Sequence, residues 1–305
     1  MTQRPPTQKQ IAERLGLSPA TVSLAMRDSP MISSDTRQLV QAAMKETGYV
    51  HNSAAAALRT GRSRIVGVSF HNIAHQYFAE MLIAIEEDLG AAGISVFINN
   101  HGEDPASLAR FVDSLVSYGA EALLVSPPPH MPDHVLLPMR ERAMPVIYIS
   151  RYLRSDDDAD RVVNADAVAT GTAAGHLIGL GHRRIVLIGG QPGTTVAEDR
   201  VSGFRAALET AGINWSDTLW QQCRPRLAEG AGAVSDILDK HALGHKDQPT
   251  GYVCFNDLVA FGMMNALRTR GIEPGRDVGV VGIGGTDEAM AFHPSLTTVL
   301  DNPAK

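Results

Sequence analysis

The sequence predicts a small all-α head followed by a larger α/β body built on parallel sheets. Short helical patterns with recognisable caps fill the head, and short apolar runs alternate with helical stretches from Ile65 onward. Charge is also unevenly distributed between the two parts. Residues 1–62 contain eight basic and four acidic residues, a net charge of +4. The remaining residues contain nineteen basic and twenty-nine acidic residues, a net charge of −10. A basic head on an acidic body indicates that the head meets a polyanion.

Composition is that of an ordinary globular protein. The 305 residues are 44% hydrophobic and 20% charged, which excludes collagenous, mucin-like and wholly disordered chains. The two cysteines, Cys223 and Cys254, form no CxxC pair, so a disulfide framework or zinc ribbon is not expected. No apolar run reaches the ~18–20 residues of a membrane span, and no signal-peptide pattern is evident. We therefore expect a cytoplasmic protein with no membrane partner.

The head begins with two helices joined by a tight turn. Thr7 is a suitable N-cap for a helix over Gln8–Leu15, and Gly16 supplies the permissive backbone of a helix end. Ser18 caps a second helix that begins at Pro19, a residue favoured at the first helical position. A third helix is predicted over Asp35–Thr47, capped by Ser33 or Ser34, with Leu39, Val40, Ala43 and Met44 facing inward.

This arrangement is that of a helix-turn-helix unit, in which the second helix reads the major groove of DNA. The residues expected at the base edges are Pro19, Ala20, Ser23 and Leu24. Those expected at phosphates are Thr21, Ser33, Thr36 and Arg27. The alternative is a three-helix bundle that binds protein, but the positive charge favours DNA.

An alanine-rich segment follows the head. Asn52 is a good N-cap and the four alanines 54–57 are strong helix formers. A helix this short is marginal alone, because isolated helices need about 12–15 residues. We expect the segment to fold only against a partner.

Residues 7–64 resemble the DNA-binding head of the LacI/GalR family of bacterial transcriptional repressors. The matching stretches are Ile11–Ser18, Ala20–Ser23, Ile32–Arg37, Gly48–Asn52 and Ala54–Leu58. The resemblance implies a hinge helix that pairs with its copy in the minor groove, through Asn52, Ala55 and Leu58, with Leu58 wedged into a base step. Leu24 stands where many members have a basic residue that reads guanine, and His51 replaces the usual proline.

In the body, the predicted strands are Ile65–Phe70, Ile94–Ile98, Ala122–Val125, Val146–Ile149, Val162–Val163, Ile185–Ile188, Gly251–Phe255 and Val278–Ile283. The predicted helices are Phe78–Ala91, Pro105–Tyr118, Val168–Leu180, Ala197–Ala211, Glu229–Lys240 and Leu258–Arg270. Apolar strands separated by helices indicate parallel sheets covered on both faces. Ligands of such folds bind at the carboxyl ends of the strands.

Enzyme motifs are lacking. The run Gly282-Ile-Gly284-Gly285 lacks the third glycine of a dinucleotide fingerprint, and no P-loop, GxSxG or HExxH occurs. His71 and His75 follow a strand with no carboxylate at metal-ligand spacing. We expect no enzymatic activity, no metal and no cofactor.

The body resembles the effector-binding core of the same family, which is similar to periplasmic sugar-binding proteins. The motifs that carry this are Leu180–Ile185, Arg200–Leu208, Phe255–Gly262, Val278–Gly282 and Pro294–Val299. The resemblance implies two parallel-sheet subdomains with a small-molecule effector between them. The implied effector-binding positions are Tyr77, Phe78, Ser150, Arg200, Asn256 and Gly284. Helix capping is the alternative role for Asn256, and core packing for Tyr77 and Phe78.

The effector itself is only partly defined. Ser150 and Gly284 stand where sugar-binding members usually have carboxylates, whereas Arg151, Arg200, Arg224 and Arg226 could lie near the cleft. This disfavours a plain neutral sugar and favours a sugar or sugar-derived effector that is anionic or less hydroxylated, unless Arg224 and Arg226 are solvated surface residues.

The sequence therefore predicts a homodimeric repressor that binds a pseudo-palindromic DNA operator under the control of a small molecule. Its predicted parts are a helix-turn-helix domain over 1–50, a hinge helix and linker over 51–64, and an effector-binding and dimerisation core over 65–305. Family members continue beyond the Val299 motif with a further helix and strand, so we expect the core to be C-terminally short. The alternative is a receptor-like solute-binding protein without DNA activity.

Overall fold

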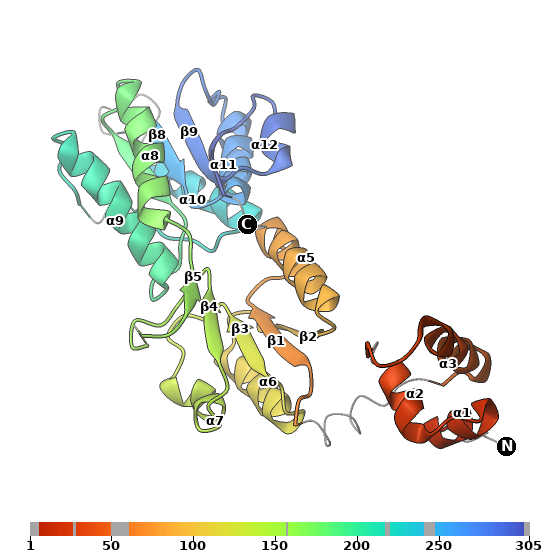
Figure 1. Ribbon diagram of the computed structural model, residues 1–305. Helices are drawn as coiled ribbons and strands as arrows, with labels where there is room; N and C mark the ends of the chain where they lie inside the picture. The colour runs from red at the N-terminus through yellow and green to blue at the C-terminus, as the bar shows by residue number, and fades with distance from the viewer. Residues whose placement is uncertain are drawn as a thin grey trace. The chain divides into compact units, whose positions relative to one another are not determined.

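The computed structural model describes residues 6–26, 29–49, 61–156, 158–216, 220–240 and 248–301. Arg27 and the hinge positions Asn52, Ala55 and Leu58 lie outside these ranges, so their expected roles stay predictions. The chain divides into two compact units, Met1–Ser63 and Arg64–Lys305, which we call the head and the body (Figure 1).

In the described part of the head, three helices begin and end at the expected caps. They are α1 (Gln8–Leu15), α2 (Pro19–Ala25) and α3 (Ser34–Thr47). Thr7, Ser18 and Ser33 each accept a hydrogen bond from a backbone N–H of the first turn. Gly16 and Gly48 end α1 and α3 with φ values of 64° and 66°, a left-handed conformation that glycine adopts without strain.

The core of the head is small and alternates small and branched side chains. It consists of Ile11, Ala12, Val22, Ala25, Val40 and Ala43, with Leu15, Leu17, Met26, Ile32, Met44 and Tyr49 packed around them. The expectation that Leu39 faces inward is wrong, because its side chain is 58% exposed. Val40, Ala43 and Met44 already fill the inward stripe of α3, and Leu39 lies one position outside it.

The described residues of the body form two five-stranded sheets in which every strand pair is parallel. The first sheet has the order β2-β1-β3-β4-β5, from β1 (Ile65–Phe70), β2 (Ser95–Asn100), β3 (Ala122–Val125), β4 (Val146–Ile149) and β5 (Arg161–Val162). The second has the order β10-β9-β8-β6-β7, from β6 (Ile185–Ile188), β7 (Trp220–Gln221), β8 (Gly251–Cys254), β9 (Gly279–Gly284) and β10 (Thr297–Leu300). Two parallel-sheet subdomains, as predicted, are thereby confirmed.

Helices cover both faces of each sheet. The first subdomain carries α5 (Gln76–Ala91), α6 (Pro105–Ser117), the 3-10 helix η1 (Asp133–Leu136) and α7 (Leu137–Arg140). The second carries α8 (Asp166–Gly179), α9 (Thr195–Thr210), α10 (Leu227–Lys240), α11 (Asp257–Thr269) and α12 (Asp287–Ala291). Figure 1 shows α8 and α9 on one side of β8 and β9, with α11 and α12 on the other.

The two-residue period of a strand explains this layering. Along β6, Ile185 and Leu187 join the cluster under α8 and α9, whereas Val186 and Ile188 join the cluster under α10 and α11. All four side chains are buried, so this central strand has no solvent-facing side. The apolar run at 185–188 is therefore the sequence signature of a strand covered twice.

Glycine allows the paired helices to approach each other closely. A Cβ atom on Gly262 of α11 would lie 1.8 Å from the carbonyl oxygen of Leu227, and one on Gly203 of α9 would lie 1.9 Å from that of Ala167. Gly230 of α10 meets the backbone of Val259 in the same way. These contacts fix how α8 packs on α9 and α10 on α11.

No helix among the described residues is long and apolar enough to span a membrane.

Candidate effector site and DNA-binding face

The main cavity of the body encloses about 880 Å³, including space open to solvent, and residues of both subdomains line it. Several of them, such as His71, Ser150 and Phe255, directly follow a strand, as expected for parallel sheets, and others lie on α5 and α9. Its lining includes Tyr77, Phe78, Ser150, Arg200, Asn256 and Gly284, together with His71, His75, Arg151, Asn164, Asp166, Phe255, Asp257, Thr286 and Asp301. The structure thus brings together all six positions that the sequence singled out.

Arg200 lines the main cavity and is held in place by several contacts. It comes from α9 and is only 6% exposed. Its Nε donates to Asp166 Oδ1 at 2.6 Å, and Nη1 donates to the carbonyl oxygen of Phe255. The guanidinium also lies over the Phe255 ring, 4.5 Å from the centroid. These contacts orient the remaining N–H groups before any ligand arrives, which lowers the entropy cost of binding.

Sequence reasoning missed two carboxylates beside Arg200. Asp166 opens α8 and Asp301 follows β10, and the Asp301 carboxylate lies 3.9 Å from Arg200 Nη2. Burial raises the pKa of both Asp166 and Asp301, and the nearby guanidinium opposes this shift. No local motif marks either residue, because only the fold brings them to Arg200.

Asn256 both caps a helix and lines the cavity. Its side-chain oxygen accepts a hydrogen bond from Val259 N at 2.9 Å, the N-cap of α11. Its Nδ2 lies 3.1 Å from His75 Nε2, a contact between the two subdomains. The capping role is therefore present, and the amide remains at the cavity wall.

Tyr77 and Phe78 also serve the core while they line the cavity. Phe78 is 5% exposed and its ring lies 4.9 Å from that of Phe70. The Tyr77 hydroxyl accepts a hydrogen bond from Asn164 Nδ2 at 3.0 Å. Burial raises the pKa of Tyr77, so the phenol is neutral and available as a donor.

Ser150 and Gly284 both have positive φ, 63° and 144°. Ser150 directly follows β4 and Gly284 is the last residue of β9, and each of these is the fourth strand of its subdomain. A Cβ atom on Gly284 would lie 3.2 Å from Asp257 Oδ2. The buried Asp257 carboxylate thus stands beside this position and accepts hydrogen bonds from Thr286 N at 2.9 Å and Thr298 Oγ1 at 2.6 Å. The carboxylate that the sequence lacks at position 284 is thus supplied nearby by Asp257.

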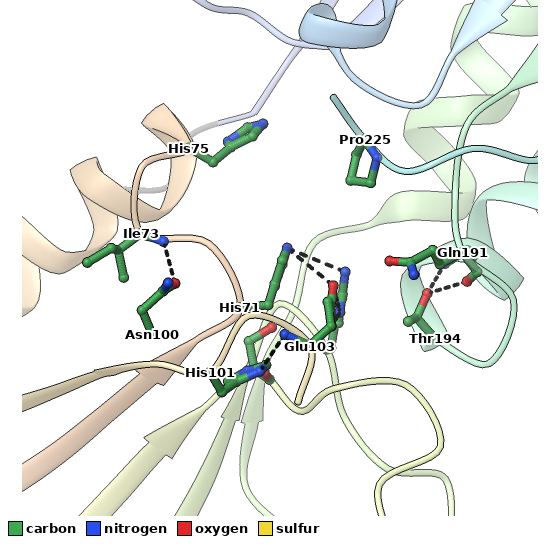
Figure 2. A network of polar contacts seen from close by, with 12 residues as sticks. His71, Ile73, His75, Asn100, His101, Glu103, Gln191, Thr194 and Pro225 are labelled. Carbon is green, nitrogen blue, oxygen red and sulfur yellow. Dashed lines mark hydrogen bonds and ion pairs between the residues drawn. The ribbon is translucent and has the colours of Figure 1, made fainter. Parts of the chain in front are cut away.

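A second cavity, of about 530 Å³, adjoins the main one. The two share His71, His75 and Pro225, and the second is further lined by Asn72, Gly102, Glu103, Gln191, Arg224 and Arg226. Figure 2 shows His71, His101 and Glu103 of the first subdomain close together, with Gln191 and Pro225 of the second subdomain across from them.

Arg151, which is buried, and Glu103, which is half-buried, form an ion pair between the cavities. Arg151 is 6% exposed, and its Nη1 lies 3.0 Å from both oxygens of Glu103. Its Nη2 donates to His71 Nε2 at 3.4 Å. Because the two opposite charges lie within hydrogen-bonding distance, each compensates the other.

His71 has a free donor at the point where the cavities meet. Burial, followed by the charge of Arg151, holds its pKa well below the ordinary value, so the ring is neutral. Because a guanidinium can only donate, Nε2 is the acceptor and the proton lies on Nδ1. That buried Nδ1 has no hydrogen-bond partner among the residues that the structure describes.

Arg224 and Arg226 differ from the other cleft arginines. Both are exposed, and neither forms an ion pair within the described ranges. They precede α10, whose first residue is Leu227. They line the second cavity and therefore lie near the cleft, and their exposure also agrees with the alternative that they are solvated surface residues.

Burial keeps both cysteine thiols in the protonated form. Burial raises the pKa of Cys254 and raises that of Cys223 to about 11, so both thiols are protonated at neutral pH. Among the described residues, no group of three or more His, Cys, Asp or Glu side chains is arranged to hold a metal ion.

In the head, the predicted base-reading residues differ in how exposed their side chains are. Pro19 and Ala20 are exposed at the start of α2, Leu24 is half-buried, and Ser23 is only 8% exposed. The predicted phosphate-contacting hydroxyls are paired at the helix starts, Thr21 with Ser18 at 2.8 Å and Thr36 with Ser33 at 2.9 Å.

A helix-turn-helix head joined to a two-sheet body with a ligand cleft defines a ligand-responsive DNA-binding protein. Residues 7–52 match the family described as bacterial regulatory proteins, lacI family, and residues 63–304 match the periplasmic binding proteins and sugar binding domain of the LacI family. The chain therefore belongs to the LacI family of bacterial transcriptional regulators.

Relatives and solved structures agree with this assignment. The chain is 30% identical to the maltose regulon regulatory protein MalI of Escherichia coli (strain K12), over 96% of this chain and 84% of that one. It is also 30% identical to the transcriptional regulator DegA of Bacillus subtilis (strain 168), over 95% and 84%. A lac repressor dimer bound to operator and the anti-inducer ONPF has the same fold, with a TM-score of 0.84 at 24% identity over 99% and 89%.

Proposed function

We propose that this chain binds a pseudo-palindromic operator as a homodimer and that a sugar or sugar-derived effector in the main cavity changes its operator affinity. The observation that carries the proposal is the main cavity itself. Its wall is built from the strand ends of both subdomains, so a ligand bound there contacts both and favours one relative position of the two.

Effector control requires that the two subdomains bind the ligand together. Arg200 and Asp166 of the second subdomain and Ser150 and Tyr77 of the first line one cavity. A shift between the subdomains changes the separation of the two hinge segments in a dimer. The resulting coupling free energy between effector and operator is typically ~1–3 kcal/mol.

Two isoleucines of the first subdomain support a homodimer. Ile83 on α5 is 59% exposed and Ile98 on the edge strand β2 is 49% exposed. Exposed branched side chains beside an edge strand suit a symmetric contact with a second copy. Two-fold symmetry of the protein is then mirrored in the half-sites of the operator.

The test is DNA binding by the purified chain. Fluorescence anisotropy would compare labelled DNA from the intergenic region upstream of its gene with a scrambled duplex of the same length, with and without a panel of sugars and sugar derivatives. We expect preference for the upstream DNA and a change in affinity with one class of sugar. Equal binding to both duplexes under every condition would favour the receptor-like alternative instead.

A further inference from the structure

The two cavities of the body have opposite charge. The main cavity is lined by four carboxylates, from Glu80, Asp166, Asp257 and Asp301, and by the guanidiniums of Arg151 and Arg200. Arg151 is already paired with Glu103, so the carboxylates prevail. Carboxylates accept hydrogen bonds from hydroxyl groups, and an anion would be repelled there. The main cavity therefore suits a neutral, hydroxylated group.

The second cavity has the reverse character. Arg224 and Arg226 line it without an ion pair in the described part of the chain, and its one carboxylate, Glu103, is neutralised by Arg151. Arg226 directly precedes α10, so the positive end of that helix dipole adds to the field of the two guanidiniums. An anionic group would therefore be attracted to the second cavity and repelled by the main cavity.

The two cavities are joined rather than separate. His71 and His75 line both, and the buried Nδ1–H of His71 has no partner among the described residues. An unsatisfied buried donor is costly unless a ligand or water accepts its hydrogen bond. A ligand oxygen at the junction would satisfy it, which indicates one ligand that extends through both cavities.

We propose that the effector is an anionic sugar derivative whose hydroxylated part lies in the main cavity and whose anionic group lies in the second cavity between Arg224 and Arg226. The inference rests on the proposed function, since it assigns the chemistry of the effector for the same cleft. The anionic group is a phosphate ester or a carboxylate, and both are recognised by paired guanidiniums.

The first experiment tests the anion site without knowledge of the effector. Isothermal titration with inorganic phosphate at low ionic strength would compare the wild-type chain, the double variant Arg224→Gln/Arg226→Gln and the control Arg110→Gln. Arg110 is an exposed arginine of α6, outside both cavities. Anion binding by the basic head is common to all three proteins, and circular dichroism verifies folding.

We expect a saturable phosphate site in the body that is at least ~tenfold weaker in the double variant and unchanged in the control, because two charge-assisted contacts are lost. Equal phosphate binding by the wild type and the double variant would overturn the anion site.

The second experiment tests whether one ligand uses both cavities. Hexose 1-phosphates, hexose 6-phosphates and hexuronates would each be titrated beside the neutral parent sugar. We expect one anionic member to bind more tightly than both its parent and inorganic phosphate, and the double variant to remove that advantage. Phosphate esters and carboxylates are titrated separately, so the class that binds more tightly identifies the anionic group.

The outcome distinguishes this inference from the proposed function. If a neutral sugar binds as tightly as its anionic derivatives and changes operator affinity, the effector is not anionic, yet ligand-controlled DNA binding stands. If no DNA preference exists at all, the proposed function fails whether or not phosphate binds between the arginines.

Discussion

Several residues that line the cleft also affect the stability of the fold, and His71 is the clearest example. Its ring is neutral because burial and Arg151 lower its pKa. The unfolded chain therefore binds a proton near the ordinary pKa of 6.5, whereas the folded chain does so only at lower pH. His75 and His101, whose pKa values are also lowered chiefly by burial, act in the same direction.

We therefore predict that the body loses stability as the pH falls below about 6.5, by up to about 1.4 kcal/mol per pH unit for each buried histidine. Urea unfolding between about pH 7.5 and 5.5 measures this slope. His71→Gln should reduce it, because one titrating group is removed. The raised pKa values of Asp166 and Asp301 act with the opposite sign, stabilising the fold as the pH falls toward 3.8. A pH-independent stability over the measured range would contradict the prediction.

Leu58 carries a second residue-scale prediction, which rests on the family resemblance. If Leu58 is wedged into a base step, Leu58→Ala should weaken operator binding by tenfold or more, about 1.4 kcal/mol, while binding to a scrambled duplex stays nearly intact. The contrast arises because nonspecific binding depends on phosphate contacts alone. Anisotropy titrations on both duplexes provide the measurement. Equal loss on both would count against the wedge.

At the scale of elements, close helix pairs are the parts most sensitive to added volume. Gly262→Ala places a methyl group 1.8 Å from the Leu227 carbonyl oxygen, so α10 and α11 must separate. We predict a loss of about 1–3 kcal/mol in the free energy of unfolding, as in other overpacked cores. Chemical denaturation measures it.

Gly232 on α10 offers a matched control. A Cβ atom there meets nothing within 4 Å. Gly232→Ala should therefore stabilise the protein by about 0.5–1 kcal/mol, because alanine lowers the entropy of the unfolded chain and favours helix. If both substitutions change stability alike, close helix packing is not what constrains position 262.

The elements also show how far the sequence could predict the structure. Capped helices were predictable because Thr7, Ser18 and Ser33 act locally, and the central strand at 185–188 because its burial is complete. The two-residue edge strand β7 and the strand β10 were not recognised, since short edge strands carry little hydrophobic pattern. Asp166, Asp301 and Glu103 were missed because tertiary structure alone brings them to Arg200 and Arg151.

For the whole molecule, the exposed isoleucines define a test of assembly. Ile83→Glu with Ile98→Lys should shift the chain toward monomer, because charges replace apolar side chains that a second copy would bury. Sedimentation velocity measures the oligomeric state, and operator affinity should fall in parallel as paired heads are lost. Leu180→Lys, at the C-cap residue of α8, which is 66% exposed, is the control and should leave assembly unchanged. A wild-type monomer, or a dimer that persists in the double variant, would contradict this contact.

The matching strand orders of the two sheets have a consequence for how a ligand is oriented. Counted along the chain, the strands of each subdomain lie side by side in the order second, first, third, fourth, fifth. The positive-φ residue Ser150 follows the fourth strand of the first subdomain, and Gly284 ends the fourth strand of the second. The cleft is thus built from two equivalent halves, and its backbone alone would accept a ligand in either of two reversed poses. Side chains remove this ambiguity, because the imidazoles of His71 and His75 come from one half and the carboxylates of Asp257 and Asp301 from the other. The direction in which a ligand binds is therefore set by side chains at the strand ends and helix starts, whereas the backbone frame of the two subdomains is the same.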